Sequence, residues 1–502
     1  MSLILPPHQR LQKQEYEAMK EKNEISKLVA TLALGLGVIS LAHGAPNVTV
    51  NAGQDHQKRL NYKRGALVTI ERNDNNTKSR INNVAAAKLD MVNFTFNLVD
   101  NQNGKSNEHM HQPLDMFYKN NDGSRGSRVD ADLTAIRKYA KNNKGLELIM
   151  QVSGGPYYGT LKVGRSNEQR FRDQSVFNYP NNQNYGPGAV GGNLFPLPVP
   201  NQQAAFGNLL GNWMRKVENA FDGDTIWIGT QEPTHTLGFP NGNKSKAAKE
   251  ANVRDYVSVW KNITSKIRGY KGAKTAGLQY NSGTSFIAYI LNQLRSQNVK
   301  VDYISYQSYR SDEFNKSMLN TTRTSMNTAA NKAHFKGTKV LFNRYSYWKD
   351  QSNNETKFNR SQGIIRFLNA EQALANNSDL VYGYVIQQGT MGKGYMLEAV
   401  MKFLQTMPAA RKTASTQQGL KVIAAGNTNQ IKIAVWNPST VNRTVEIKIN
   451  NAPAAIKNSN MSVMVGNGAN YQSKNANRTS SGSSVTIKGF SLPKKAFALI
   501  SL

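Results

Sequence analysis

The most constraining feature of this sequence is an alternation of short apolar runs with longer amphipathic stretches, which begins near Gly65. The short runs are rich in β-branched residues, and several are apolar almost throughout, as is typical of strands in a buried parallel sheet. We predict eight such strands: Ala66–Ile70, Met91–Phe96, Leu146–Val152, Thr225–Gly229, Thr275–Gln279, Val301–Tyr306, Lys339–Phe342 and Leu380–Ile386.

The longer stretches between these strands have helical periodicity. In Gly207–Ala220, for example, the apolar residues on one helical face are Leu209, Leu210, Trp213, Met214 and Val217. We predict helices at Ala131–Lys141, Gln203–Ala220, Ala247–Arg268, Phe286–Gln297, Lys316–Lys332, Gly363–Ala375 and Met396–Thr406. Strands that alternate with helices in this way predict an α/β fold, a (β/α)8 TIM barrel.

The pattern changes after Thr413, where short strands are separated by Asn, Gly, Pro and Ser turns and no helical pattern intervenes. We predict strands at Leu420–Ala424, Gln430–Trp436, Thr444–Ile449, Ser462–Val465, Ser484–Ile487 and Phe497–Leu502. This is typical of an antiparallel β-sandwich. We therefore expect three parts: an N-terminal extension with a signal peptide over 1–45, a barrel over 46–412 and a C-terminal β-sandwich domain over 413–502, which packs on the barrel.

The apolar run Leu28–Ala42 is too short to span a membrane comfortably. Lysines precede it, and Ala42-His43-Gly44 follows with small residues where a signal peptidase cleaves. This predicts a secretory signal peptide with cleavage near Gly44-Ala45, and translation that starts at Met19. We expect a secreted or periplasmic protein with no stable membrane insertion after cleavage.

Composition adds two constraints. The 63 Lys and Arg against 32 Asp and Glu give a net charge of +31, which favours an acidic partner: nucleic acid, an anionic lipid surface or an acidic polysaccharide. Nucleic acid is the weakest of the three, because no arginine-rich arm and no zinc-finger spacing is present. The alternative interpretation is a generally basic proteome, because the Lys and Arg are scattered rather than grouped. The chain has no cysteine, so disulfides, thiolate metal sites and a Cys nucleophile are excluded.

The most informative stretch for function is Asp224-Thr-Ile-Trp-Ile-Gly-Thr-Gln-Glu-Pro-Thr-His235, in which the fourth predicted strand is followed by Gln231-Glu232-Pro233. A carboxylate at the carboxyl end of a barrel strand faces the substrate. The stretch resembles the clan A glycoside hydrolases, nearest to family 39 and its relatives, in which the fourth strand ends in Asn-Glu and the Glu is the general acid/base. The resemblance implies that role for Glu232, with Gln231 in place of the Asn.

Further stretches are similar to the same clan. Gln151-Val-Ser-Gly-Gly-Pro-Tyr157 resembles the end of its third strand, and Val301-Asp-Tyr-Ile-Ser-Tyr-Gln-Ser-Tyr309 the end of its sixth, with Gln307 where a His often stands. The barrel followed by a sandwich also resembles family 39. The resemblance covers about 65–500 and implies a glycoside hydrolase that degrades an extracellular polysaccharide.

The seventh strand departs from this pattern. The clan carries its nucleophile, a Glu, at the end of that strand, but Asn343 and Arg344 stand there and no acid follows before Asp350. One explanation is that the second carboxylate comes from another strand end. We favour Glu313, with Glu71 and Glu398 as further candidates, and an inverting enzyme tolerates the wider spacing of about 6.5–9.5 Å.

A second explanation is a polysaccharide lyase. β-Elimination on a uronate polymer needs a cation or amide that neutralises the substrate carboxylate and a base that removes a proton. Asn343, Arg344 and Tyr345 or Tyr347 supply these residue types together, and the planar guanidinium suits a carboxylate. The opposing interpretation is that Arg344 pairs with Glu232.

A third explanation is a glycan-binding protein without catalysis. Aromatic side chains near strand ends are candidate platforms for sugar rings, and we name Trp227, Tyr157, Tyr158, Tyr306, Tyr309 and Trp348. The alternative interpretation is that such aromatic residues fill the barrel.

The predicted site is completed by residues that bind substrate. These are Gln231, His235, Asn343, Tyr345, Trp348, Tyr306, Gln307, Tyr309, Tyr157, Asn93 and Arg72, beside the catalytic candidates Glu232, Arg344 and Glu313. His109 and His111 form a pair without a third ligand, so we predict no metal. We also expect no other cofactor, because no phosphate-binding or dinucleotide fingerprint is present, and a monomer.

Overall fold

The computed structural model describes residues 46–68, 74–97, 135–153, 203–221, 223–229, 246–280, 286–308, 312–345, 360–386 and 396–502. The predicted signal peptide, the first 45 residues, lies outside these ranges. Within them, no helix combines the length and apolar character that crossing a membrane requires.

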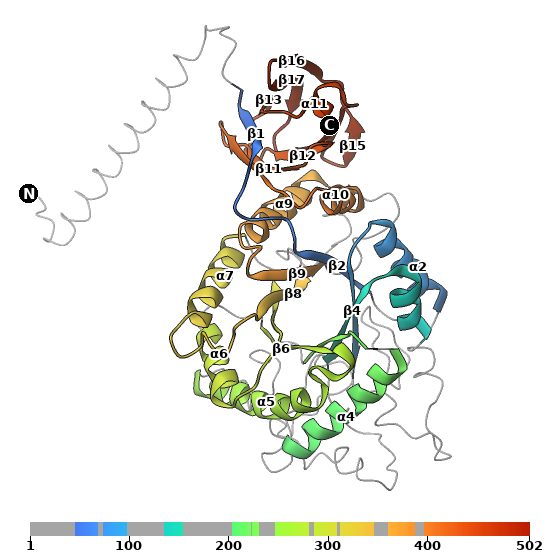
Figure 1. Cartoon of the computed structure of the whole chain (residues 1–502), viewed down its shortest axis with the longest axis vertical. Helices are drawn as coiled ribbons and strands as arrows, with labels where there is room; N and C mark the ends of the chain where they lie inside the picture. The colour runs from blue at the N-terminus through green and yellow to red at the C-terminus, as the bar shows by residue number, and fades with distance from the viewer. Residues whose placement is uncertain are drawn as a thin grey trace, which may run out of the picture. The chain divides into compact units, whose positions relative to one another are not determined.

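The central part of the chain is a closed barrel of parallel strands with helices outside it, which confirms the predicted α/β class (Figure 1). Each strand pairs with its neighbour in sequence, and the last pairs with the first. The barrel strands are β2 (Lys63–Val68), β3 (Met91–Asn97), β4 (Glu147–Ser153), β5 (Ile226–Ile228), β6 (Lys274–Tyr280), β7 (Tyr303–Ser308), β8 (Lys339–Tyr345) and β9 (Val381–Ile386).

Helices follow the strands along the chain. They are α2 (Asp74–Ala86), α4 (Gln203–Phe221), α5 (Lys246–Ile267), α6 (Ile287–Ser296), α7 (Asp312–Met326), α9 (Ser361–Ala375) and α10 (Met396–Gln405), with the π-helical turn η2 (Tyr139–Asn143) and the 3-10 turn η7 (Tyr270–Gly272). The sequence pattern missed α2, because this helix is polar along most of its length and buries only a few apolar residues such as Ile81 and Val84.

Two hydrophobic clusters fill the barrel. One lies between the strands and the helices. The other, here called the lumen cluster, lies inside the ring of strands and consists of Leu67, Met91, Ile149, Ile226, Ile228, Ala276, Tyr303, Leu341 and Val385. Side chains of successive residues in a strand point to opposite faces, so the lumen cluster identifies which residues of each strand face inward.

A polar cluster fills the lumen where the strands begin. Glu147 accepts hydrogen bonds from Lys63 Nζ at 2.9 Å and from Tyr382 Oη at 2.6 Å, and the rings of Tyr303 and Tyr382 lie 4.4 Å apart. Burial raises the pKa of Tyr303 and of Tyr382. This end of a barrel is ordinarily concerned with stability, which leaves the carboxyl ends of the strands for a site.

Two sheets form a separate sandwich, as predicted, and their strands pair antiparallel with one exception, described below (Figure 1). One sheet has the strand order β10 (Lys412–Thr416), β1 (Val48–Asp55), β13 (Arg443–Asn450), β17 (Ser484–Leu492) and β16 (Asn477–Ser481). The other has the order β11 (Lys421–Gly426), β12 (Ile431–Trp436), β18 (Phe497–Ser501), β14 (Ser462–Asn467) and β15 (Asn470–Ser473). The short helix α11 (Ala454–Asn458) connects β13 to β14.

One strand of the sandwich comes from the segment that the sequence pattern assigned to the barrel. β1 lies between β10 and β13, antiparallel to the first and parallel to the second. Val48 and Val50 are fully buried in the sandwich core. The expected barrel start at residue 46 is therefore wrong for this strand, because the alternating valines of β1 fit a half-buried strand of a sandwich.

The sandwich packs against the barrel helix α9 through polar contacts. Asn369 accepts hydrogen bonds from Trp436 Nε1 at 2.8 Å and from Lys421 Nζ at 2.9 Å. Ser361 Oγ donates to the main-chain oxygen of Lys495 at 2.6 Å. Trp436 is fully buried in the larger hydrophobic cluster, so the two parts share apolar packing as well.

Candidate functional site

Three buried amide side chains face the barrel lumen from three different strands. Asn93 on β3, Gln151 on β4 and Asn343 on β8 each lie two positions after a member of the lumen cluster, namely Met91, Ile149 and Leu341. They are completely shielded from solvent. We call Asn93, Gln151 and Asn343 the amide layer; it lies on the apolar lumen cluster, on the side of the barrel where active sites form.

The amide layer is connected across the lumen by two hydrogen bonds. Asn93 Nδ2 donates to the main-chain oxygen of Asn343 at 3.1 Å, and Asn343 Nδ2 donates to Gln151 Oε1 at 3.3 Å. Because a carbonyl oxygen only accepts, Asn93 must present its NH2 group to Asn343, and this fixes which way its amide faces. The layer therefore links the second, third and seventh strands of the barrel.

Two acceptor atoms of the layer have no hydrogen-bond partner: Asn93 Oδ1 and Asn343 Oδ1. Ser305 Oγ on β7 is a third unpartnered polar atom. Ser305 also faces the lumen, because it pairs in register with Leu341 and follows Tyr303 by two positions. A buried polar group without a partner costs about 1–3 kcal/mol, so three such atoms in one lumen require an explanation.

The end of β8 is irregular on both sides. Opposite β7 the register passes from Tyr306↔Phe342 to Gln307↔Arg344, which leaves Asn343 as an extra residue. Opposite β9 the register also shifts after Phe342. Bulges of this kind are frequent next to active sites, where they redirect the residues that follow. This is the strand end at which the sequence departs from the clan A pattern.

The strand that leads to Glu232 ends against two aromatic side chains. Tyr256 and Trp260 of α5 are buried and lie with their ring centroids 6.2 Å apart. A Cβ atom at Gly229, the residue after β5, would lie 1.8 Å from Tyr256 Oη, so this position requires glycine. The packing determines where the chain leaves β5, three residues before Glu232.

Most of the predicted site residues lie outside the described part of the chain. These are Glu232, Gln231, His235, Tyr157, Tyr158, Tyr309, Tyr347, Trp348, Arg72, Glu71, Asp350, His109 and His111. Gln307 lies on β7, Arg344 and Tyr345 lie on β8, and Glu313 lies in the first turn of α7, but the description does not extend to their side chains. Asn93 and Asn343 are the predicted residues that the structure brings together.

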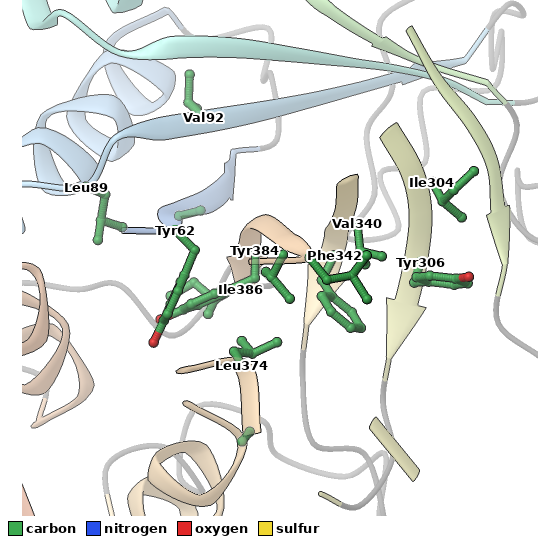
Figure 2. Packing of buried hydrophobic residues seen from close by; sticks show 14 of the residues in the cluster. Tyr62, Leu89, Val92, Ile304, Tyr306, Val340, Phe342, Leu374, Tyr384 and Ile386 are labelled. Atoms are coloured by element: carbon green, nitrogen blue, oxygen red, sulfur yellow. The ribbon is translucent and has the colours of Figure 1, made fainter. Parts of the chain in front are cut away.

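Two predicted sugar platforms are wrong. Tyr306 belongs to the cluster between strands and helices, where it packs near Phe342, and its Oη lies 2.6 Å from Thr322 Oγ1 on α7 (Figure 2). Trp227 faces the same way and donates from Nε1 to Glu218 Oε1 on α4 at 2.6 Å. Both side chains are almost completely buried and point away from the lumen, because they alternate with inward-facing neighbours.

Three described carboxylates have raised pKa values, namely Glu218, Asp255 and Glu398. Burial raises the pKa of Glu218, although the Trp227 hydrogen bond opposes this shift. Burial also raises the pKa of Glu398, which lies in the first turn of α10 and was a candidate for the second catalytic acid. Among the described residues, no three His, Asp or Glu side chains are grouped closely enough to hold a metal ion.

The sequence pattern missed Gln151 and Ser305 as site residues. Both interrupt apolar strands at inward-facing positions, and this is the signal that was available for them. In Glu147–Ser153 the pattern of strand β4 places Gln151 two positions after Ile149. A polar residue at an inward position of a barrel strand, near its carboxyl end, therefore marks the site better than an aromatic residue does.

Comparison with solved structures identifies the fold. No family model and no curated protein sequence matches this chain. The glycoside hydrolase family 30 subfamily 8 xylanase from Clostridium acetobutylicum aligns with a TM-score of 0.54 at 15% identity, over 91% of this chain and 99% of that chain. A glucosidase from Croceicoccus marinus aligns with a TM-score of 0.55 at 12% identity, over 91% and 99%.

A family 30 endoxylanase from Clostridium papyrosolvens gives the same picture, with a TM-score of 0.52 at 12% identity over 91% of this chain and 99% of that chain. These similarities extend over both the barrel and the sandwich. The chain thus has the architecture of a glycosidase barrel with a C-terminal β-sandwich.

Proposed function

We propose that this chain is an exported glycoside hydrolase-like enzyme that cleaves an extracellular polysaccharide, with Glu232 as its general acid/base. The observation that carries the proposal is the position of the amide layer. Neutral hydrogen-bonding side chains lie in the lumen, and one of them, Gln151, lies on β4, the strand that pairs with β5, after which Glu232 follows. Sugar sites combine such polar groups with a carboxylic acid that protonates the leaving oxygen.

The fold supports the proposal without establishing it. The solved structures with this architecture named above are xylanases and a glucosidase. Because they are only 12–15% identical to this chain, the similarity shows the fold and not the activity. The net charge of +31 favours a polymer that carries acidic groups, because a positive surface field concentrates a polyanion. Export rests on the signal-peptide pattern of Leu28–Ala42.

A second candidate is a glycan-binding protein without catalysis, and one observation favours it. The place at the end of β8 that the clan reserves for a carboxylate holds Asn343, and an amide cannot act as a nucleophile or as a base at neutral pH. If no other carboxylate supplies the second catalytic group, the barrel retains affinity for sugar without cleaving it.

The test is product release from a panel of neutral and acidic polysaccharides, with wild type beside Glu232→Gln. We expect reducing ends from at least one polymer and a loss of at least about 100-fold in the variant, the usual scale of general acid catalysis. Glu218→Gln serves as the control for removal of a carboxylate elsewhere, because Glu218 lies on the helix side of the strands, where it accepts a hydrogen bond from Trp227. The absence of product from every polymer, with retained binding, would establish the second candidate.

Absorbance at 235 nm in the same digests distinguishes hydrolysis from elimination, because only elimination forms a conjugated double bond. Reducing ends without this absorbance support hydrolysis. Reducing ends accompanied by it would mean that the chain is a lyase, and the roles proposed for Asn343, Arg344 and Tyr345 would then be tested by substitution.

A further inference from the structure

The unpartnered atoms of the lumen have a definite chemical character. Asn93 Oδ1 and Asn343 Oδ1 are acceptors, and Ser305 Oγ can donate or accept. On each asparagine one N–H of the amide is engaged, with Asn343 O for Asn93 and with Gln151 Oε1 for Asn343, while Oδ1 has no partner. The two Oδ1 atoms therefore require donors, and each amide has a second N–H that can donate to an acceptor.

The described side chains around these atoms are neutral. Besides the amides and Ser305, the described inward-facing residues of the neighbouring strands are apolar, namely Leu67, Ile228, Ala276 and Val385. The charged side chains Lys63, Lys274 and Glu147 lie at the opposite end, where the strands begin. A carboxylate brought to the amide layer would meet carbonyl oxygens and no described cation, whereas a hydroxyl group would supply the missing donor.

We propose that the amide layer and Ser305 form a recognition floor for the hydroxyl groups of a neutral sugar unit. The inference rests on the proposed function and deepens it, because it names the class of the unit bound in the lumen. The net charge favours a polymer with acidic groups, and in this proposal those groups lie on sugar units bound outside the lumen. Asn343 then binds a hydroxyl group of the neutral unit, whereas in a lyase it would neutralise the carboxylate of a uronate.

Binding of matched oligosaccharides tests the inference. The probes are cellohexaose and β-1,4-mannohexaose, each beside its hexamer oxidised to the uronate at C6, with xylohexaose and laminarihexaose to widen the neutral set. Dissociation constants are measured by calorimetry in the Glu232→Gln background, so that no probe is consumed. We expect at least one neutral hexamer to bind about 10-fold more tightly than its oxidised partner.

Two substitutions show whether the lumen atoms cause this preference. Ser305→Ala removes an unpartnered hydroxyl from the lumen without breaking a hydrogen bond within the described structure, so the fold is preserved. Loss of one ligand hydrogen bond predicts weaker neutral binding by about 2- to 12-fold. Asn343→Leu removes an acceptor and predicts a loss at least as large, accompanied by a smaller preference over the oxidised hexamer.

Thr275→Val is the matched control. Thr275 is equally buried and its hydroxyl is also unpartnered, but it lies beside Ala276 on the face directed toward the helices. This variant should bind every hexamer as the parent does. Equal losses in Ser305→Ala and Thr275→Val would show that only general packing changed, and would overturn the inference.

The outcomes separate the inference from the proposed function. Neutral binding that depends on Ser305 and Asn343, with no product from any polymer, would retain the floor and reject hydrolysis. Product release with an unchanged preference in both variants would retain hydrolysis and reject the floor. Tighter binding of the oxidised hexamers, or binding of no neutral hexamer, would overturn the inference directly.

Discussion

Asn93 Nδ2 lies 3.1 Å from the main-chain oxygen of Asn343, and this hydrogen bond joins β3 to β8 across the barrel lumen. It supports the residue that the bulge of β8 leaves without a partner in register. Asn93→Ala should leave a buried carbonyl oxygen unpaired and lower the free energy of unfolding by about 1–3 kcal/mol. Urea denaturation measures the change; Asn320→Ala on the exposed surface of α7 should change it by less than about 0.5 kcal/mol.

Arg64 and Glu371 form a buried ion pair between β2 and α9. Arg64 Nε donates to Glu371 Oε1 at 2.9 Å, and Tyr62 Oη donates to the same oxygen at 2.6 Å. Glu371→Ala leaves the Arg64 guanidinium buried without its counter-charge, and should destabilise the fold by about 3–5 kcal/mol.

The double variant Arg64→Met with Glu371→Leu removes both charges of this pair. It should recover most of the stability that Glu371→Ala loses, because no uncompensated charge remains. A double variant that is as unstable as the single one would show that the loss comes from packing rather than from charge. Thermal unfolding of the three proteins makes the comparison.

Tyr306 should affect stability and leave carbohydrate binding unchanged. Its Oη is hydrogen-bonded to Thr322 on the helix side of β7, so Tyr306→Phe loses one buried hydrogen bond, worth about 0.5–1.5 kcal/mol. Oligosaccharide dissociation constants should equal those of wild type. Weaker binding in this variant would contradict the position of the Tyr306 side chain on the helix side of β7.

Glu218 should make stability depend on pH. Burial raises its folded-state pKa above the ordinary value of 4.5, so the fold favours the protonated carboxyl. Its contribution is greatest below pH 4.5, declines as the pH rises through the raised pKa and is constant above it. Glu218→Gln retains an acceptor for Trp227 and removes this decline. Urea denaturation from about pH 4 to about pH 8 should show that the difference in free energy of unfolding between wild type and Glu218→Gln changes with pH. A difference that stays constant would contradict the raised pKa of Glu218.

The strand β1 should be indispensable to the sandwich. Val48 and Val50 are fully buried, and each apolar side chain of this size contributes about 1.5–3 kcal/mol when buried. A chain that begins at Leu60 should therefore unfold at a markedly lower temperature than one that begins at Pro46. Calorimetry should place the largest change in the sandwich, and equal unfolding temperatures would contradict the pairing of β1 with β10 and β13.

The sequence was sufficient to predict the barrel, because each barrel strand is short, apolar and followed by a periodic helix. It was insufficient for β1, whose partners on β10 and β13 lie far away in the sequence and leave no local signal. The edge strands β15 and β16 were also missed, since their residues are mainly polar and exposed. Local pattern thus predicts elements, whereas long-range pairing assigns them to a domain.

Prediction of the candidate site from the sequence had a similar limitation. Asn343 was predicted from its place at the end of the seventh strand, and the structure joins it through a hydrogen bond to Asn93, another predicted substrate-binding residue. Tyr306 and Trp227 were misplaced because residue type was weighed more heavily than strand alternation. One residue further along a strand reverses the direction of a side chain, so an aromatic residue at a strand end faces either the substrate or a helix.

The sheet that contains β1 has a consequence for the order of folding. Asn51 and Asn451 are hydrogen-bonded although they are 400 residues apart. Contacts so distant in sequence form slowly and cannot form before the later partner has been synthesised. The barrel strands pair mostly with near neighbours in sequence, so the barrel can assemble before β1 pairs. β1 is synthesised first and has no sheet to join until β10 and β13 have been made. When it pairs with them, the first described strand of the chain becomes an interior strand of a sheet formed by the last part.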